Sequence, residues 1–599
     1  MIKFFKKIIS LIVDFVCEQF LVLLFMIALG LKLFFINTYI LKITWPFDQY
    51  IYGVIFGFIS AAIIFLPALF AKKHKIKLAF FIASLISIII LIDLIYFSYF
   101  IALPNIGLLN LLSQASGFVP AISGLLNWWL ILYLADIALA IFLLKSKLKI
   151  FKKIKKQCQN IKSSFKASLL FLGLVLFTFT ITFFNVGGIN KINGIINNSN
   201  DTVGTAQYYG VLMAHVIDFV RLIEENTTSL SPTKEKLLSN WVRTNKPLQT
   251  DNDLTGIAKG KNVIMIQVES LGGFVLNQVI NGKEVTPNLD KLAKNSQFYP
   301  NNRFITGAGH TSDSDFVANT SYFPLNDAAV FVRYGNDDFS SLPKTLVTNG
   351  YSTYAYHGYN RNFWNRDTAL NSLGYQKFYA ADNYPKGSTI NLGLNDGDFL
   401  SNTADYIVNQ PKPSFSYIIT LSSHVPFAIT DHTKALNINL NDYPNQVGGY
   451  LENINYTDRM LGDFFAKLKI KKLYDDSLII IYGDHTPVLP KFTAGTINYD
   501  PKTVQSKEVP LIIKLPNNTT DQTYINQGTS LDIAPTIFDL LDIKTNQLMF
   551  GQSLFANNRL PVCSDQLVVF LKTDNCDTAL IDEKNQSAMI IKYNQFNNL

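Results

Sequence analysis

Three short polar strings, far apart in the chain, contain the residue types of a metal-assisted phosphate site. They are Val-Glu-Ser at 268–270, Gly-Ala-Gly-His-Thr-Ser-Asp at 307–313 and Gly-Asp-His at 483–485. Glu269, Asp484 and His485 offer carboxylate and imidazole ligands for a divalent cation. Thr311 offers a hydroxyl that such a cation can activate as a nucleophile. These residues therefore predict chemistry on a phosphate, if the fold brings them together.

The first and third strings each follow a run of β-branched and apolar residues, over 262–268 and 478–482. Such runs are typical of strands that are buried on both faces of a parallel sheet. Ligands of open α/β sheets bind at the carboxyl ends of the strands. We therefore expect Glu269, Asp484 and His485 to meet at one edge of a sheet.

Thr311 stands where a helix is expected to begin, because it is followed by Ser-Asp-Ser-Asp. Backbone N–H groups at a helix start can hold phosphate oxygens, and the helix dipole favours a developing anion. Gly307 and Gly309 would let a phosphate approach the backbone closely. A residue that only caps a helix would have the same local sequence, so the catalytic interpretation depends on the strings around Glu269 and Asp484.

Two histidines are expected at the ends of further strands. His357 closes a predicted strand over 352–356, and His424 follows the end of a predicted strand over 414–421. A histidine at a strand end is often only a hydrogen-bonded turn residue. These two histidines, however, are expected at the same sheet edge as the three candidate metal ligands. Their shared position favours a role for both of them in the site.

The string Phe-Trp-Asn-Arg-Asp at 363–367 adds a cation and an aromatic ring. Arg366 could bind a phosphodiester through two parallel N–H groups, and Trp364 could pack against a glycerol-like body. We interpret four other acids as caps and loop residues outside the site: Asp313, Asp315, Asp396 and Asp398.

The rest of the chain from Asn262 alternates apolar strands with helical stretches, which predicts a doubly wound α/β domain. Another strand is expected over 509–515, and helices are expected over 287–296, 450–470 and 530–541. We expect four regions: a transmembrane domain over 1–190, an extracytoplasmic linker over 191–258 with a helix near 208–225, a catalytic domain over 259–545 and a C-terminal extension over 546–599.

Five apolar segments are long enough to cross a bilayer, which takes about 20 residues. They lie near 19–40, 49–71, 78–101, 123–144 and 167–188. Three of them carry a charged residue, namely Lys32, Asp93 and Asp136. An acid inside a membrane is a candidate functional group, although an acid near a helix end or facing water inside the bundle has only a structural role.

Lysines predict how these segments are oriented. The N-terminus and the loops after the second and fourth segments are rich in lysine, and such loops stay in the cytoplasm. Five spans then place the N-terminus inside and residues 190–599 outside. The net charge of +8 comes largely from these lysines, so it indicates contact with anionic lipid and no nucleic-acid surface.

Four cysteines are present, and two of them, Cys563 and Cys576, lie in the part that is expected outside the cell membrane. In an oxidising compartment this isolated pair favours a disulfide over two free thiols. A single exported disulfide is more typical of a Gram-negative periplasm, where a glucan or another envelope glycan would be the acceptor.

In this order of motifs the chain resembles the lipoteichoic acid synthase family, within the alkaline phosphatase/sulfatase superfamily. The resemblance rests on five spans followed by Val-Glu-Ser, Thr-Gly-x-Gly-x-Thr-Ser-Asp, Phe-Trp-Asn-Arg-Asp, Ser-x-His-x-Pro and Tyr-Gly-Asp-His. It implies a five-helix transmembrane bundle in a bacterial inner membrane. It also implies an outward sulfatase-like α/β domain with a largely parallel sheet between helices.

The resemblance also implies a reaction and a role for each candidate residue. Thr311 would be the nucleophile that takes phosphoglycerol from phosphatidylglycerol, releases diacylglycerol and passes the group to an envelope glycan or a polyglycerolphosphate chain. Its implied metal is Mn²⁺, with Mg²⁺ as the alternative, bound by Glu269, Thr311, Asp484 and His485. The residues implied to surround the phosphoglycerol group are Ser270, His357, Trp364, Arg366 and His424.

Three positions depart from the family pattern and leave the donor headgroup and the acceptor open. Gln267 stands where a histidine is common, His310 replaces a lysine, and Tyr359 replaces a small polar residue. A phosphoethanolamine transferase, a phosphodiesterase or phospholipase of the same superfamily, and a catalytically inactive envelope scaffold are the alternative functions. A sulfatase is excluded, because the chain lacks the Cys/Ser-x-Pro-x-Arg string from which formylglycine is made.

Overall fold

A computed structural model of the chain divides it into two compact units, and each is described here by itself. The first unit comprises residues 1–106 and 125–227, and the second comprises 107–124 and 228–599. The structure describes residues 2–36, 47–71, 73–100, 103–106, 133–138, 141, 165–185, 188, 205–206, 209–227, 230–244, 252–557, 559 and 576–596, apart from 327, 445, 519–521 and 524–527.

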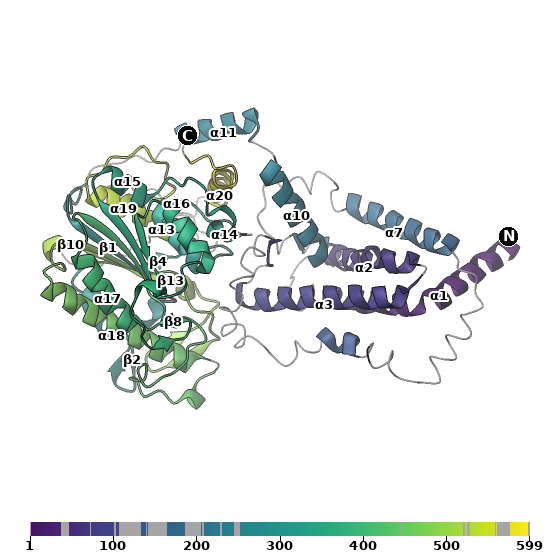
Figure 1. Cartoon of the computed structure of the whole chain (residues 1–599), viewed down its shortest axis with the longest axis horizontal. Helices are drawn as coiled ribbons and strands as arrows, with labels where there is room; N and C mark the ends of the chain where they lie inside the picture. The colour runs from purple at the N-terminus through teal and green to yellow at the C-terminus, as the bar shows by residue number, and fades with distance from the viewer. Residues whose placement is uncertain are drawn as a thin grey trace. The chain divides into compact units, whose positions relative to one another are not determined.

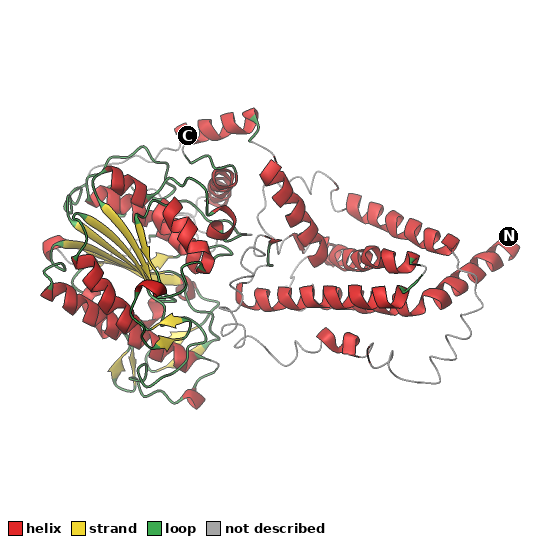
Figure 2. Cartoon of the chain, viewed as in Figure 1, coloured by secondary structure: helices red, strands yellow, loops and turns green. Residues whose placement is uncertain are grey.

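The described part of the first unit is helical (Figure 2). Its long helices are α1 (Ile2–Phe35), α2 (Phe47–Phe70), α3 (Lys75–Phe100), α7 (Phe165–Asn185) and α10 (Val211–Thr227). By length and composition, the segments Lys75–Phe97 and Ala167–Asn185 could each cross a membrane, whereas α1 and α2 contribute shorter apolar stretches, Gln19–Phe35 and Val54–Phe70. The first, second, third and fifth expected spans thus coincide with helices. The fourth lies mostly outside the described residues, so the bundle of five remains a prediction.

The three charged residues of the predicted spans all have partners inside this unit. Lys32 Nζ lies 2.5 Å from Asp136 Oδ1 and 2.6 Å from Ser87 Oγ. Both carboxylate oxygens of Asp93 lie 3.1 Å from His215 Nε2, which joins α3 to α10. These pairs agree with the structural interpretation of the two acids, because buried charges are tolerated when they are paired.

An eight-stranded sheet forms the centre of the second unit (Figure 1). Its strand order is β14 (Gln522–Thr523), β4 (Gln297–Arg303), β13 (Glu508–Lys514), β10 (Ser477–Gly483), β1 (Asn262–Val268), β9 (Ser414–Ile419), β5 (Ser352–His357) and β6 (Lys377–Tyr379). The five strands from β10 to β6 run parallel to one another. Only β13 runs antiparallel to its neighbours β10 and β4 in this sheet. The sheet is therefore mixed, although most of its pairs are parallel as expected.

Helices cover both faces of the sheet (Figure 1). On one face lie α13 (Thr311–Thr320), α15 (Leu342–Thr348) and α19 (Ile533–Leu540); on the other lie α12 (Pro287–Ala293), α17 (Asp396–Val408) and α18 (Val447–Ile470). In β1, Val263 and Met265 pack into the first core, and Ile264 and Ile266 pack into the second. Successive side chains of a strand point to opposite faces, so a strand between two helical layers must be apolar throughout.

The smaller elements of the second unit complete the description. The helices are α11 (Pro232–Thr244), α14 (Val330–Tyr334), α16 (Arg366–Ser372) and α20 (Cys576–Lys592). Three two-stranded sheets pair β2 (Val279–Ile280) with β3 (Lys283–Glu284), β7 (Thr389–Ile390) with β8 (Gly393–Leu394), and β11 (Phe492–Ala494) with β12 (Ile497–Tyr499). The expected disulfide is not tested, because Cys563 lies outside the described residues.

Candidate active site

The candidate metal ligands meet at the carboxyl ends of neighbouring strands, as the sequence predicted. Glu269 directly follows β1, and Asp484 and His485 directly follow its parallel neighbour β10. One ligand atom from each of the three lies within 4.8 Å of the others, and all three residues are buried. The fold therefore brings together two carboxylates and an imidazole from residues more than 200 positions apart.

Backbone and hydroxyl groups hold these ligands in place. Asp484 Oδ1 accepts hydrogen bonds of 2.7 Å from the backbone N–H groups of both Ser270 and His485. Ser270 Oγ donates to Glu269 Oε1 at 2.7 Å. The Nδ1 atom of His485 lies 3.1 Å from the carbonyl oxygen of Thr486, so Nδ1 is the protonated nitrogen and Nε2 is left to act as a ligand.

The free ligand atoms and their charges fit a divalent cation. Asp484 Oδ2 is buried and has no hydrogen-bond partner among the described residues. Burial, together with the nearby Glu269 carboxylate, raises the pKa of Asp484 well above its ordinary value. Burial alone would raise the pKa of Glu269 too, but His424, His485, the hydrogen bond from Ser270 and the charge of Arg366 together hold that pKa below the ordinary value. A bound cation would relieve the repulsion between the two carboxylates.

Thr311 is the first residue of α13, as expected, and its hydroxyl faces the cluster of Glu269, Asp484 and His485. Thr311 Oγ1 lies 3.3 Å from Glu269 Oε2 and 3.3 Å from His485 Nε2. The preceding residue, His310, has a φ of 43°, and its ring lies edge-on to that of His485 with centroids 5.4 Å apart. The hydroxyl thus lies among the ligands and at the positive end of the helix.

The glycines before Thr311 have a packing role that the sequence did not reveal. A Cβ atom at Gly307 would lie 1.9 Å from the carbonyl oxygen of Leu325, and one at Gly309 would lie 2.5 Å from Asp313 Oδ1. Asp313 accepts hydrogen bonds from the backbone N–H groups of both glycines, at 2.9 and 2.7 Å. Asp313 therefore organises the loop that leads to Thr311, in agreement with its interpretation as a loop acid.

Arg366 and His357 form a second group beside the metal ligands. Arg366 is 1% exposed, and its Nη1 atom lies 3.4 Å from Nε2 of His357. The other ring nitrogen of His357 lies 3.2 Å from the carbonyl oxygen of Ile419. Burial and the Arg366 charge hold the pKa of His357 well below its ordinary value, so the imidazole is neutral and accepts from Arg366.

The interpretation of Asp315 as a cap or loop acid was wrong, because Asp315 is a buried residue inside α13. Its Oδ2 atom accepts a 2.8 Å hydrogen bond from Arg366 Nε, and both side chains are buried. The Nη2 atom of Arg366 remains buried without a partner among the described residues. Asp315 lies four residues after Thr311 on α13, and that one-turn spacing is the sequence signal that could have identified it.

Gln267 and two tyrosines complete the surroundings of Asp315. Gln267 Nε2 donates to Asp315 Oδ1 at 2.8 Å, and Tyr482 Oη donates to Gln267 Oε1 at 2.6 Å. Tyr417 Oη lies 2.9 Å from Asp315 Oδ1 and 2.7 Å from Gln267 Oε1, so its single proton is shared between these two acceptors. Sequence reasoning noted Gln267 only as a departure from a family pattern, whereas the structure shows that it connects β1, β9 and β10 to Asp315.

His424 and Trp364 lie on the segments that the sequence indicated. Glu269 is tied to the segment before His424, because its backbone N–H donates to Thr420 Oγ1 and its carbonyl accepts from Ser423 Oγ. His424 is close enough to Glu269 to lower the pKa of that carboxyl group. Trp364 is 6% exposed, has a left-handed φ of 58° and packs against Phe363, with ring centroids 5.9 Å apart.

Two family descriptions match adjacent parts of the chain. The lipoteichoic acid synthase N-terminal domain matches residues 1–230, and the sulfatase domain matches residues 261–543. The second match contains all the candidate site residues described above, from Gln267 to His485.

Individual relatives match most of the chain. The lipoteichoic acid synthase of Staphylococcus saprophyticus is 29% identical over 549 residues, which are 88% of this chain and 83% of that protein. A lipoteichoic acid synthase of Staphylococcus aureus is 30% identical over 525 residues, 84% of this chain and 78% of that protein. Among solved structures, the lipoteichoic acid synthase LtaP from Listeria monocytogenes is 28% identical and has a TM-score of 0.49, covering 53% of this chain and 80% of that one. With this extent of identity over both parts, the chain belongs to the lipoteichoic acid synthase family.

Proposed function

We propose that this chain is a membrane-anchored phosphoglycerol transferase that works through a covalent phosphothreonine at Thr311. The observation that carries the proposal is the position of the Thr311 hydroxyl, 3.3 Å from both Glu269 and His485 at the start of a helix. Membership of the lipoteichoic acid synthase family supports the same reaction.

The reaction that we propose has two steps. Thr311 Oγ1 attacks the phosphorus of phosphatidylglycerol, the bond from phosphorus to the diacylglycerol oxygen breaks, and diacylglycerol leaves with the proton of the threonine hydroxyl. Phosphoglycerol stays on the threonine. The oxygen of an acceptor hydroxyl then attacks the same phosphorus, the bond from phosphorus to Thr311 Oγ1 breaks, and the proton of the acceptor hydroxyl restores the free threonine. The acceptor is an envelope glycan or a polyglycerolphosphate chain.

The residues around Thr311 have separate roles in this scheme. Glu269, Thr311, Asp484 and His485 would hold Mn²⁺, or Mg²⁺ in its place, and the cation would supply positive charge to the phosphate and the threonine oxygen. Arg366 directs its unpartnered Nη2 atom to a phosphate oxygen, and Asp315 holds the guanidinium in position.

The other substrate-binding residues are proposed by position. His357 accepts from Arg366 and so fixes the plane of the guanidinium. Ser270 orients Glu269, and His424 adds a donor from the neighbouring loop. Trp364 packs against the glycerol body. None of these roles needs a charged His357, in agreement with its lowered pKa.

We further propose that residues 1–190 form the transmembrane domain with five spans and a cytoplasmic N-terminus in the cell membrane of a bacterium. Residues 191–258 would link it to the extracytoplasmic catalytic domain over 259–545, which is followed by an extension over 546–599. Two described helices that are long and apolar enough to span a membrane support the anchoring. An anchored domain keeps a lipid headgroup within reach of Thr311.

One assay tests this function against its alternatives. Purified full-length protein is incubated with Mn²⁺ and labelled phosphatidylglycerol or phosphatidylethanolamine, and the release of diacylglycerol is followed. Release from phosphatidylglycerol that is absent in Thr311→Ala supports the proposal. Preference for phosphatidylethanolamine would indicate a phosphoethanolamine transferase, free glycerol phosphate as the sole product would indicate a phosphodiesterase, and no release from either lipid would indicate an inactive scaffold.

A further inference from the structure

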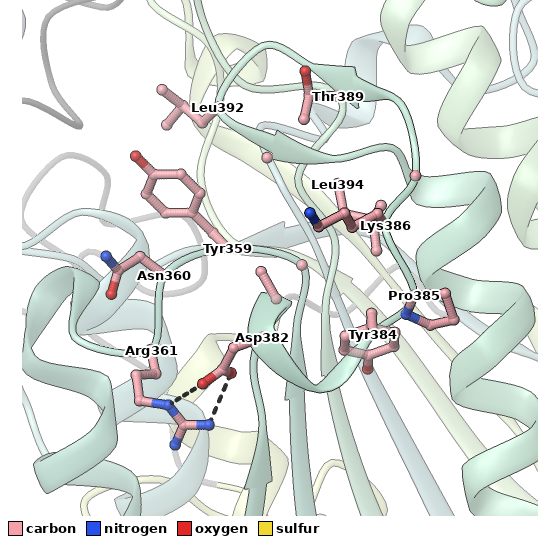
Figure 3. Close-up of a pocket in the computed structure, with 14 residues that line it drawn as sticks. Tyr359, Asn360, Arg361, Asp382, Tyr384, Pro385, Lys386, Thr389, Leu392 and Leu394 are labelled. Carbon is pink, nitrogen blue, oxygen red and sulfur yellow. Dashed lines mark hydrogen bonds and ion pairs between the residues drawn. The ribbon is translucent and has the colours of Figure 1, made fainter.

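The second unit contains a cavity of about 490 Å³ (Figure 3). Three segments line it: the loop 358–361 after β5, the segment 381–387 and the β7–β8 hairpin. Because that loop begins directly after His357, the cavity belongs to the surroundings of the proposed active site. An apolar face of α10, in the first unit, takes no part in the proposed reaction.

Helix α10 exposes apolar side chains along one face. Among its described residues, the exposed ones are Val216, Phe219, Val220 and Ile223, with exposed fractions of 45–53%. Their spacing is i, i+3, i+4 and i+7, so these four side chains form a single stripe, the outer face of α10. A helix on a water-exposed surface would present its polar side chains there instead.

The polar side chains of α10 face the other helices of the first unit. His215 Nε2 lies 3.1 Å from both carboxylate oxygens of Asp93 on α3. Asp218 and Arg221 are 3% and 2% exposed, and Asp218 Oδ2 accepts a hydrogen bond of 2.7 Å from the backbone N–H of Ile106. The amphipathic character of α10 is therefore inverted relative to that of a helix in water.

Apolar contacts join α10 to two further helices of the first unit. Ile217 of α10 and Phe56 of α2 belong to one buried cluster. Phe179 and Phe183 of α7 pack against the same cluster, and the next residue, Phe184, is 66% exposed. Helix α7 thus has an exposed apolar surface beside its contact with α10, and α7 is long and apolar enough to span a membrane.

These contacts lie at one level of the predicted membrane. By the orientation that the lysines predict, α3 and α7 end and α2 begins on the outer side. Counted from those helix ends, Phe56, Asp93 and Phe179 lie about 9–14 Å inside the membrane-spanning helices. The hydrocarbon layer of one leaflet is about 15 Å thick. The groups that hold α10 are therefore at the depth of the outer leaflet.

The direction of α10 fits a helix that lies near the plane of the membrane. It runs at a steep angle to α2, α3 and α7 (Figure 1). Because membrane-spanning helices run across the bilayer, a helix at a steep angle to them runs closer to its plane. Helices with this orientation insert an apolar face about 5–10 Å into the boundary between headgroups and acyl chains.

We propose that α10 is a membrane-interface helix whose outer face contacts the acyl chains of the outer leaflet. The partner of this surface is the lipid bilayer itself, and this part of the predicted linker belongs to the membrane domain. Only residues 228–231 separate α10 from α11, whose Leu238 and Val242 lie in the core of the second unit. Helix α10 thus holds the attachment point of the catalytic domain at the level of the lipid headgroups.

Photo-crosslinking in a bilayer tests this contact. The photoreactive residue p-benzoylphenylalanine replaces Phe219 in the full-length protein, which is reconstituted in vesicles of phosphatidylglycerol and phosphatidylcholine and irradiated. Intact mass spectrometry of the delipidated protein measures the fraction that carries a phospholipid. The measurement needs no enzymatic activity, so its result is independent of the proposed transferase function.

Two matched positions calibrate the lipid yield. Phe177 on α7 is 64% exposed on a predicted span and is the positive control, whereas Ile470 at the end of α18 is 79% exposed in the second unit and is the negative control. We expect at least about ten-fold more lipid adduct at position 219 than at position 470. Ile223, one turn further along the outer face, is a second site that should give the same result if the change at Phe219 impairs folding.

Lipid yields at positions 219 and 223 no higher than at position 470 would overturn the proposal. Crosslinks from these two positions to the second unit, or to another copy of the chain, would overturn it as well, because protein would then cover the outer face of α10.

Discussion

The two units of this protein place their apolar side chains in opposite ways. On α7 of the first unit, Phe177 and Phe184 are 64% and 66% exposed, whereas β1 and β10 of the second unit are fully buried. Large apolar side chains on an outer helical surface are unfavourable in water and favourable in hydrocarbon. The first unit therefore has a surface suited to lipid, and the second has a core suited to a water-exposed domain.

The two units also differ in how the polar atoms of their buried charged side chains are partnered. In the first unit, Asp93 directs both oxygens to His215, and Lys32 contacts Asp136. In the second unit, Asp484 Oδ2 and Arg366 Nη2 are buried and have no hydrogen-bond partner among the described residues, although Asp484 Oδ2 lies 3.4 Å from His485 Nε2. An unpartnered buried polar atom costs free energy unless a ligand completes it. The charged groups of the first unit are thus compensated by protein partners, whereas the open atoms of Asp484 and Arg366 fit the binding site that we propose.

Removal of the nucleophile should have the largest effect. Thr311→Ala is expected to lower diacylglycerol release at least about a thousand-fold, because no other hydroxyl is held between Glu269 and His485 among the described side chains. Stability should change by about 1 kcal/mol at most, because His310 is the N-cap of α13 and Thr311 makes no capping hydrogen bond. Release assays and thermal unfolding measure the two effects. Thr320→Ala on the same helix is the control, and activity retained in Thr311→Ala would contradict the assignment.

Loss of the Asp484 carboxylate should show most clearly that a buried acid has a different role in each unit. Asp484→Ala is expected to remove both bound metal and activity, because Asp484 Oδ2 is the atom left for a cation. Asp93→Asn should leave the metal content unchanged, because Asp93 already has a protein partner. Metal analysis of the purified proteins tests both expectations. Equal metal content in Asp484→Ala and wild type would require a different site.

Loss of the anion behind Arg366 should have an intermediate effect. Asp315→Asn keeps the side-chain volume but leaves the guanidinium without its charge partner, so we expect the KM for phosphatidylglycerol to rise about 10–100-fold. Breaking this buried pair should also cost about 3–5 kcal/mol of stability. Metal content should stay normal. Asp290→Asn, which changes a buried acid away from the site, is the control; a normal KM in Asp315→Asn would exclude the positioning role.

Lowering the pH should destabilise the protein because His357 is neutral in the folded state. This is the smallest effect that we predict. Its folded pKa lies well below the ordinary 6.5, so the unfolded chain binds more protons below that pH. Stability should therefore fall as the pH is lowered from 7 to 5, and this part of the loss should be absent in His357→Asn. Melting temperatures at both pH values test it. Identical pH dependence in the two proteins would contradict a depressed pKa.

Much of the site could be predicted because its residues follow strongly patterned strands. The run over 262–268 coincides with β1, and the parallel pairing of β1 with β10 fixes Glu269 beside Asp484. Thr311 was predicted at a helix start from the residues that follow it, and it is the first residue of α13. Local patterns suffice in these places because strand ends and helix starts are determined by neighbouring residues.

Other features could not be predicted from local patterns. The run over 509–515 identified a strand, but its apolar residues do not encode the antiparallel direction of β13. Asp315 looked like one more acid of a helix start, and only the folded structure shows that it pairs with Arg366, which lies 51 residues later in the chain. Gln267 gains its role in the same way, through tyrosines on two neighbouring strands.

The sequence by itself determined the types of residue available for the chemistry, the strands and helix that carry them, and the apolar character of the first 190 residues. These properties follow from short-range periodicity and composition. Only the tertiary structure decided which oxygen of Asp484 lacks a hydrogen-bond partner, which acid holds Arg366, and which residues line the cavity next to the loop after β5. The reason is physical: burial and hydrogen-bond partners depend on contacts between distant segments, and those contacts exist only in the folded chain.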